Sequence, residues 1–274
     1  LHSRNCDISS GSDVQMTDRK LYQFGDSPCC MKVRMVLAAK SLPWDEVFIE
    51  SWKFDHFQPE YLALNPSGTV PTFVEDGQVV TESNVIVEYL EDAYPTPPLR
   101  PDDPYLASIM RKWMYIEQDH LFGHIVTLSF NSMMKLRVEG FGLEQLQEWS
   151  HRHPDKALAD DYLRRVTAPV DHAKDVSARA GLRKYMVLLE EELSRFNGSW
   201  ICGEQLTLAD VALAGIFDRL KYLCEETVFG DLPLVSKWFE RLQETTVYKE
   251  GEHRFSARMW GPLKPIAEYR DQIR

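Results

Sequence analysis

The chain has 274 residues, 44% of them hydrophobic and 11% aromatic, which is enough to bury a substantial core and to form two domains. Its formal net charge of -11 argues against a nucleic-acid partner, because phosphate backbones require a concentrated basic face. No apolar run approaches the roughly 18 residues that a membrane span requires, so we expect no membrane partner.

The five cysteines stand at positions 6, 29, 30, 202 and 224, and none of them forms a C-x-x-C pair or a paired zinc pattern. Their odd number favours a reducing compartment, so we expect a cytoplasmic protein without a bound metal. Residues 1–17 are mostly polar and include Met16, which resembles a natural initiator. We expect this segment to be a cloning scar or disordered.

The first elements are a strand followed by a helix. The short apolar run at residues 20–24 predicts a buried strand. Ser27 and Pro28 then mark a helix start, with serine at the N-cap and proline at the first helical position. A second strand at 44–49 and a short helix at 55–64 follow.

A hairpin and a third helix complete this half. Asp76-Gly77 lies between the apolar runs 72–74 and 78–80, which predicts a two-residue hairpin turn. Ser83 is expected to cap a helix over 84–93. The resulting order βαβαββα predicts an α/β thioredoxin-like domain over residues 18–94.

Half of the positions from 95 to 104 are proline, so we expect a stiff linker at 95–103. Beyond it the apolar periodicity is helical, which predicts an all-α domain over 104–250 and a tail at 251–274. The expected helices lie at 104–138, 143–166, 171–196, 207–223 and 233–245. Thr207 and Asp210 resemble a capping box ahead of a buried helix.

Three short motifs carry the chemistry. Ser27 and Cys29 stand at a helix N-terminus, where the helix dipole and a hydroxyl can lower the pKa of a thiol. Val70-Pro71 precedes a strand, where a cis proline would expose backbone groups to an extended peptide. Glu82-Ser83 could hold the ammonium and carboxylate groups of an amino acid. Taken singly, each motif could instead serve only capping or packing.

In this order the motifs resemble the glutathione transferase family, over residues 19–250. The resemblance implies that Val70, Pro71, Glu82 and Ser83 bind glutathione. It also implies that a serine or cysteine at the first helix serves the glutathione sulfur; Ser27 is the first choice for this role and Cys29 the second. A homodimer, and a hydrophobic, aromatic electrophile as second substrate, are implied as well.

Within the family, the segments 79–92 and 144–185 are similar to bacterial β-aryl etherases, and the motif at 27–32 is similar to reductive dehalogenases and zeta-class isomerases. The expected activity is therefore conjugation or β-aryl ether cleavage by a glutathione thiolate. The alternatives are dehalogenation or isomerisation through Cys29, and a glutathione-binding module without catalysis. Tyr115 is predicted to contact the second substrate, and the His120 and His124 pair is not expected to bind metal.

Overall fold

The computed structural model describes residues 18–136, 142–196 and 199–252. The predictions for residues 1–17 and for nearly all of the tail at 251–274 therefore lie outside the described residues. Within these ranges, no helix has the length and apolar character needed to span a bilayer.

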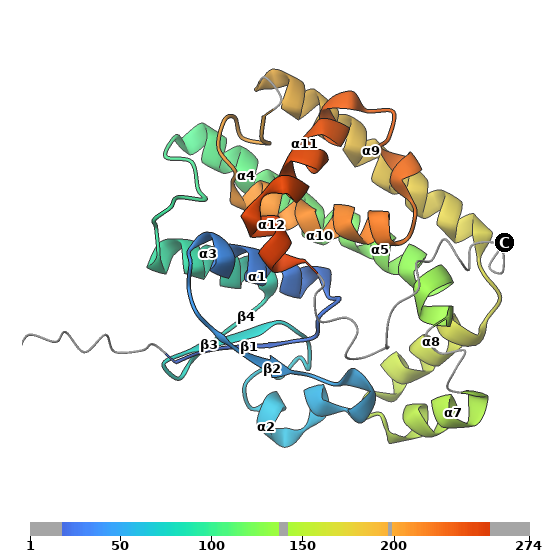
Figure 1. Ribbon diagram of the computed structural model, residues 1–274. Helices are drawn as coiled ribbons and strands as arrows, with labels where there is room; N and C mark the ends of the chain where they lie inside the picture. The colour runs from blue at the N-terminus through green and yellow to red at the C-terminus, as the bar shows by residue number, and fades with distance from the viewer. Residues whose placement is uncertain (1–17, 137–141, 197–198, 253–274) are drawn as a thin grey trace, which may run out of the picture.

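The first unit is a four-stranded mixed sheet in the order β2-β1-β3-β4. Strand β1 is parallel to β2 and antiparallel to β3, which forms a hairpin with β4. Helices α1 and α3 cover one face of the sheet, and the short α2 lies on the other side (Figure 1). The predicted thioredoxin-like order βαβαββα is confirmed. The bounds are β1 Arg19–Gln23, α1 Pro28–Ala39, β2 Asp45–Phe48, α2 Pro59–Leu62, β3 Thr72–Glu75, β4 Gln78–Thr81 and α3 Ser83–Ala93.

The turn between β3 and β4 shows why the sequence folds as a hairpin here. Asp76 and Gly77 have φ values of 49° and 81°, as a two-residue turn of the primed type requires. Glycine adopts this conformation without steric cost, and aspartate tolerates it better than most residues. The register Glu75↔Gln78 then places Phe73 in the core.

The second unit is helical, as predicted. Its first helical stretch, residues 104–134, is called the rod here and contains two π-helical turns. These turns widen the helix without breaking it. The bounds are α4 Pro104–Ile116, η3 Glu117–Leu121, α5 Phe122–Ser129, η4 Phe130–Met134, α7 Gly142–Arg152, α8 Lys156–Thr167, α9 His172–Arg195, α10 Leu208–Tyr222, η5 Glu226–Val228, α11 Pro233–Glu244 and α12 Thr246–Gly251.

Two predicted helices are wrong in extent, both because of proline. The helix expected at 55–64 is a 3₁₀ turn η2, Asp55–Phe57, followed by α2, and η2 is itself preceded by η1, Ser51–Lys53. The helix expected at 143–166 is split into α7 and α8 at Pro154. A residue before proline is disfavoured in the helical region, so the chain turns there, and the Asp155 side chain caps α8.

Helix α10 forms the centre of the helical unit and is buried along most of its length. The predicted capping box is present: Thr207 is the N-cap and Asp210 accepts from the Thr207 N–H at 2.8 Å. Helix α10 also packs on α1, as does α12 (Figure 1). The core is therefore continuous between the two units.

Candidate active site

The register of the sheet brings the three predicted motifs together. Thr72, the first residue of β3, pairs with Tyr22 of β1 on one side and with Thr81 of β4 on the other. The chain leaving β1 towards Ser27, the chain entering β3 after Pro71 and the chain leaving β4 into Glu82 therefore meet at one end of the sheet. Motifs about 55 residues apart in the sequence become neighbours by strand pairing alone.

Ser27 is the N-cap of α1, as predicted. It is 6% exposed, and its Oγ accepts a hydrogen bond from the Cys30 backbone N–H at 3.3 Å. Because a hydroxyl has one proton to donate besides its lone pairs, this bond does not use the Ser27 O–H, which is also within hydrogen-bonding reach of the Cys30 thiol. The α1 dipole adds positive potential at the same point. Ser27 is thus equipped to stabilise an anion in front of the helix.

The two cysteines behind Ser27 are held as thiols. Burial raises the pKa of Cys30 to about 12. Burial also raises the pKa of Cys29, and the charge of Lys32 and a hydrogen bond with Ser83 oppose this only in part. Neither thiol is therefore ionised at neutral pH in this environment, although Cys29 is partly exposed.

The Glu82-Ser83 motif differs in detail from the expectation. Ser83 is the first residue of α3, and Glu82 rather than Ser83 occupies the N-cap position, without a side-chain cap bond. Glu82 has φ 66°, ψ 114°, a region that a non-glycine residue occupies only when its surroundings enforce it. The exposed Glu82 carboxylate and the start of α3 thus present opposite charges side by side.

The Val70-Pro71 peptide is cis, the form on which the predicted role of this motif depends. Pro71 is buried and Val70 partly exposed. The loop before them is fixed by Asn65, whose Nδ2 donates to the Thr69 carbonyl at 2.9 Å and to Thr72 Oγ1 at 3.0 Å. Tyr61 reinforces the same point by sharing a hydrogen bond with Thr72 Oγ1.

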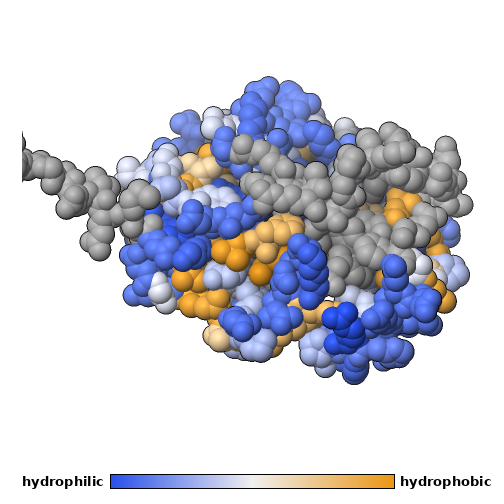
Figure 2. Space-filling view, turned by 60° about the horizontal axis from the view of Figure 1, so that its bottom comes forward, coloured by the Kyte–Doolittle hydropathy of each residue, from blue (hydrophilic) through white to orange (hydrophobic). Residues whose placement is uncertain are grey.

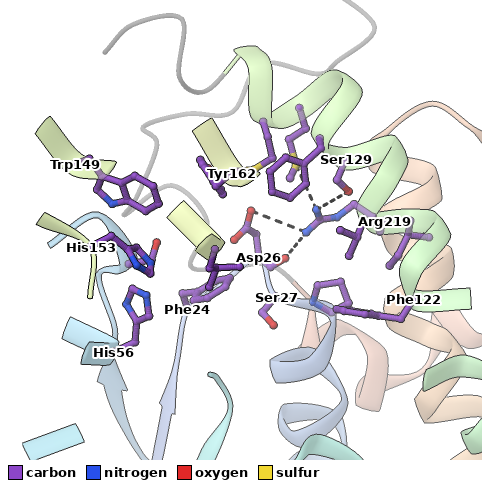
Figure 3. Close-up of a pocket in the computed structure, with 18 residues that line it drawn as sticks. Phe24, Asp26, Ser27, His56, Phe122, Ser129, Trp149, His153, Tyr162 and Arg219 are labelled. Atoms are coloured by element: carbon purple, nitrogen blue, oxygen red, sulfur yellow. Dashed lines mark hydrogen bonds and ion pairs between the residues drawn. The ribbon is translucent and has the colours of Figure 1, made fainter. Parts of the chain in front are cut away.

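A cavity of about 340 Å³ opens beside Ser27, between the two units (Figure 3). Its size lies in the range of small-molecule sites. Its wall is mainly apolar and aromatic. The lining residues come from the loop between β1 and α1, from α1, η1, η2 and α10, from the α5–η4 part of the rod and from the α7–α8 pair. The lining residues are Phe24, Asp26, Ser27, Pro28, Ser51, His56, Phe122, Ile125, Val126, Ser129, Phe130, Met133, Met134, Trp149, His153, Leu158, Tyr162 and Arg219.

The charged side chains of the cavity wall compensate each other. Arg219 and Asp26 form a buried ion pair with N and O atoms 4.0 Å apart. The Arg219 guanidinium also donates to the Asp26 carbonyl and, at 3.2 Å, to Ser129 Oγ. Because the charges are balanced within the wall, the cavity favours a neutral ligand over an ion.

Two histidines lie beside each other at the end of the cavity away from α1 (Figure 3). Burial and the neighbouring His153 lower the pKa of His56 to about 4, and burial lowers the pKa of His153. The Asp155 N–H donates to His153 Nδ1 at 3.0 Å. Both imidazoles are therefore neutral at pH 7, in keeping with the apolar wall.

Some predicted residues do not reach this cavity. Tyr115 is 58% exposed on the outer side of α4, where its ring contacts His120. Cys29, Val70, Pro71, Glu82 and Ser83 are also outside its lining. Phe122 and Phe130, which belong to the same helical stretch as Tyr115, do line it.

Other lining residues were not predicted from the sequence. Phe24 and Asp26 flank Ser27, and this adjacency is a signal that could have found them. Trp149, His153 and Tyr162 stand in no motif, so only the fold identifies them. Among the described residues, no group of three or more His, Cys, Asp or Glu side chains is arranged to hold a metal ion.

Two family models match the chain. Residues 21–98 match "Glutathione S-transferase, N-terminal domain" and residues 155–245 match "Glutathione S-transferase, C-terminal domain".

Similar proteins cover most of the chain. Protein LigF of Sphingobium sp. strain SYK-6 is 28% identical over 84% of this chain and 91% of its own length. FtsZ-localized protein A of Caulobacter vibrioides is 27% identical over 93% and 97%, respectively. The crystal structure of beta-etherase LigF superposes with a TM-score of 0.73 and 26% identity, covering 85% of this chain and 98% of that one.

Proposed function

The chain belongs to the glutathione S-transferase family, whose co-substrate is glutathione, and on that premise we propose that it uses a glutathione thiolate to attack an aromatic or ether-bearing electrophile. The observation that carries the proposal is the position of Ser27. Ser27 lines an aromatic cavity at the N-terminus of α1, and the Cys30 N–H occupies one lone pair of its hydroxyl. The Ser27 O–H is then the donor that stabilises the glutathione thiolate, which lowers the pKa of the thiol.

Glutathione itself is proposed to bind across the end of the sheet. The Val70 backbone would pair with its cysteinyl part next to the cis Pro71. Ser83 and the N-terminus of α3 would bind its γ-glutamyl carboxylate, and Glu82 its ammonium group. These positions adjoin Ser27 through the strand register described above.

For the second substrate we propose β-aryl ether cleavage or conjugation, in line with the likeness to the beta-etherase LigF. In ether cleavage the thiolate sulfur forms a bond to the carbon that bears the ether oxygen. The carbon–oxygen bond breaks, and its electron pair leaves with the aryloxide, which takes a proton from water. The neutral, aromatic cavity suits both the substrate and the departing phenol.

The experiment compares Ser27→Ala with Cys29→Ala. Because a hydrogen bond to a charged group contributes about 1.5–3 kcal/mol, Ser27→Ala should lower kcat/KM about 10- to 100-fold at neutral pH. Ser27→Thr keeps a hydroxyl and should retain most activity. Cys29→Ala should stay within about twofold of the wild type, since Cys29 is protonated and outside the cavity.

Ser27→Gly serves as the stability control. Glycine replaces a serine N-cap at a cost of only a few tenths of a kcal/mol, so this variant removes the hydroxyl while α1 stays capped. Its kcat/KM should fall by as much as that of Ser27→Ala. Full activity in both variants, with loss in Cys29→Ala, would instead favour the dehalogenase or isomerase chemistry in which Cys29 reacts.

A non-catalytic glutathione-binding module is the second candidate, because the similar FtsZ-localized protein A is named for its localisation and not for an enzymatic activity. The two candidates differ in one measurement. An enzyme should ionise bound glutathione, which is visible as thiolate absorbance in the ultraviolet, whereas a module would bind glutathione without this signal. Retention on immobilised glutathione alone fits both.

The proposal includes a cytoplasmic homodimer. The four cysteines within the described ranges are free, in keeping with a reducing compartment. Four apolar or aromatic side chains are exposed on β4, α3 and α4: Val79, Val85, Tyr105 and Tyr115. In a homodimer a second copy of the chain would bury such side chains. Apolar patches between polar areas are also visible on the face in Figure 2. Light scattering of the purified protein tests the dimer.

A further inference from the structure

One wall of the cavity is an aromatic cluster formed by Phe130, Trp149 and Tyr162. The rings of Phe130 and Tyr162 meet edge to face with centroids 5.1 Å apart, and those of Trp149 and Tyr162 are tilted with centroids 5.0 Å apart. All three residues line the cavity. Aromatic rings in such arrangements offer both edges and faces to a further ring.

The aromatic cluster is fixed from outside. Phe54 of the first unit stacks on Trp149 with an interplanar angle of 18° and centroids 5.7 Å apart, and Phe54 does not line the cavity. The Arg165 guanidinium lies 3.9 Å from the centre of the Phe130 ring. Because these partners hold two of the three rings in place, little conformational entropy remains to be lost when a ligand binds.

The aromatic cluster is also remote from Ser27. Figure 3 shows Trp149 and Tyr162 on the opposite side of the cavity from Ser27 and Phe122. Trp149 lies between the two segments that match the family models, which end at residue 98 and resume at residue 155. The cavity therefore has one end near Ser27 and α1 and an aromatic end, and Phe130 and Trp149 of that end lie outside the two matched segments.

Resting on the proposed function, we propose that Phe130, Trp149 and Tyr162 form a subsite for a second aromatic ring of the acceptor substrate. The ring held there is the one that does not leave, while the carbon under attack lies next to Ser27. Trp149 is the specificity-determining residue of this subsite, because it also joins the cavity wall to the first unit through Phe54. The preferred acceptors accordingly carry two rings.

The test uses two acceptors with the same reacting carbon and the same phenoxide leaving group. One is an α-aryloxy ketone with an aryl group on the carbonyl, and the other is the matching methyl ketone. Trp149→Leu should lower kcat/KM for the two-ring acceptor about tenfold, mainly through KM, because aromatic contact is lost while apolar volume is largely kept. The one-ring acceptor should change by less than about twofold.

Two control variants separate ring binding from structural support. Trp149→Phe keeps a ring and should restore most of the preference for the two-ring acceptor. Phe54→Leu removes the support behind Trp149 but leaves all three rings in the cavity lining, so it should lower the preference for the two-ring acceptor by less than Trp149→Leu does. Equal losses on both acceptors in Trp149→Leu, or the same change of ratio in Phe54→Leu, would overturn the subsite.

A binding measurement keeps this inference separate from the proposed chemistry. Calorimetry with the two-ring ketone in the absence of glutathione should give a weaker affinity for Trp149→Leu than for the wild type, by about tenfold. If the wild type turns over neither ketone, the thiolate chemistry fails, yet this difference would still support the subsite. Equal affinity in the two proteins would refute the subsite whatever the activity.

Discussion

At the scale of single residues, the candidate site depends on which groups are kept neutral. The Cys29 and Cys30 thiols are held protonated, and His56 and His153 are held uncharged. The anion that Ser27 is proposed to stabilise would then come from the substrate. A site of this kind adds no net charge of its own beside the cavity, since Asp26 and Arg219 compensate each other. The negative sulfur of glutathione would then be the dominant charge there.

His56 makes folding stability depend on pH. Its pKa is lowered from 6.5 to about 4, so the folded protein binds fewer protons at this group than the unfolded chain. The stabilisation is therefore complete above about pH 6.5 and is lost as the pH falls towards 4. Allowing for partial exposure, we expect a loss of about 2 kcal/mol between pH 7 and pH 4.5 from His56.

Urea unfolding at fixed protein concentration measures this loss. The variant His56→Phe should show a pH dependence smaller by about 2 kcal/mol over the same interval, because phenylalanine cannot bind the proton. The carboxylates contribute equally in both proteins, so the difference reports His56 together with its charge coupling to His153. Identical pH dependence in the variant and the wild type would mean that His56 is charged as readily in the fold as in water.

At the scale of elements, capping side chains determine where each helix begins. The Asp155 side chain starts α8 just after Pro154, and the Asp103 side chain starts α4 by accepting from the N–H groups of Tyr105 and Leu106. Asp210 does more than cap α10. It is fully buried and accepts hydrogen bonds from Ile201 N–H at 3.1 Å and from Trp238 Nε1 at 2.8 Å, in addition to the one from Thr207.

The prediction for this element is a large loss of stability in Asp210→Ala. The substitution leaves several buried N–H groups without their acceptor, which should cost about 3 kcal/mol or more. Asp103→Ala is the matched control, since Asp103 is an exposed N-cap whose loss should cost about 1 kcal/mol. Urea unfolding compares the two, and equal losses would show that burial of Asp210 adds nothing to its capping role.

At the scale of the whole molecule, the two units share one core and meet directly behind the candidate site. Lys32 of α1 donates to Glu117 at 2.8 Å and to Asn84 at 2.9 Å, which links the first unit to the rod of the second. Gly215 of α10 lies against the backbone of Pro28, where an added Cβ would stand 2.8 Å from the Pro28 carbonyl oxygen. The start of α1 is therefore positioned by the helical unit as well as by the sheet.

Gly215→Ala should consequently affect both stability and catalysis. The methyl group meets backbone atoms that cannot turn away, so overpacking should cost about 1–3 kcal/mol and displace Ser27 along with Pro28. Gly123→Ala is the control, because nothing lies within 4 Å of its added Cβ and alanine favours the helix by about 1 kcal/mol. Unfolding and kcat/KM are measured on both variants, and an unimpaired Gly215→Ala would contradict the tight contact.

The sequence by itself determined the fold class and the local chemistry. Turn and cap residues such as Asp76-Gly77, Ser27-Pro28 and Thr207 act through their own backbone and near neighbours, so their effect can be predicted without the fold. The same holds for the motifs at Val70-Pro71 and Glu82-Ser83, whose meeting point follows from the strand order.

Only the tertiary structure decided which side chains form the cavity. Tyr115 and Phe122 belong to one helical stretch but lie on different faces of it. Tyr115 is exposed to solvent, whereas Phe122 lines the cavity. Trp149 and Tyr162 reach the cavity because Pro154 breaks their helix, so that α7 and α8 pack against each other and Trp149 stacks on Phe54. Such contacts join residues far apart in the chain through packing, which has no short-range signature in the sequence.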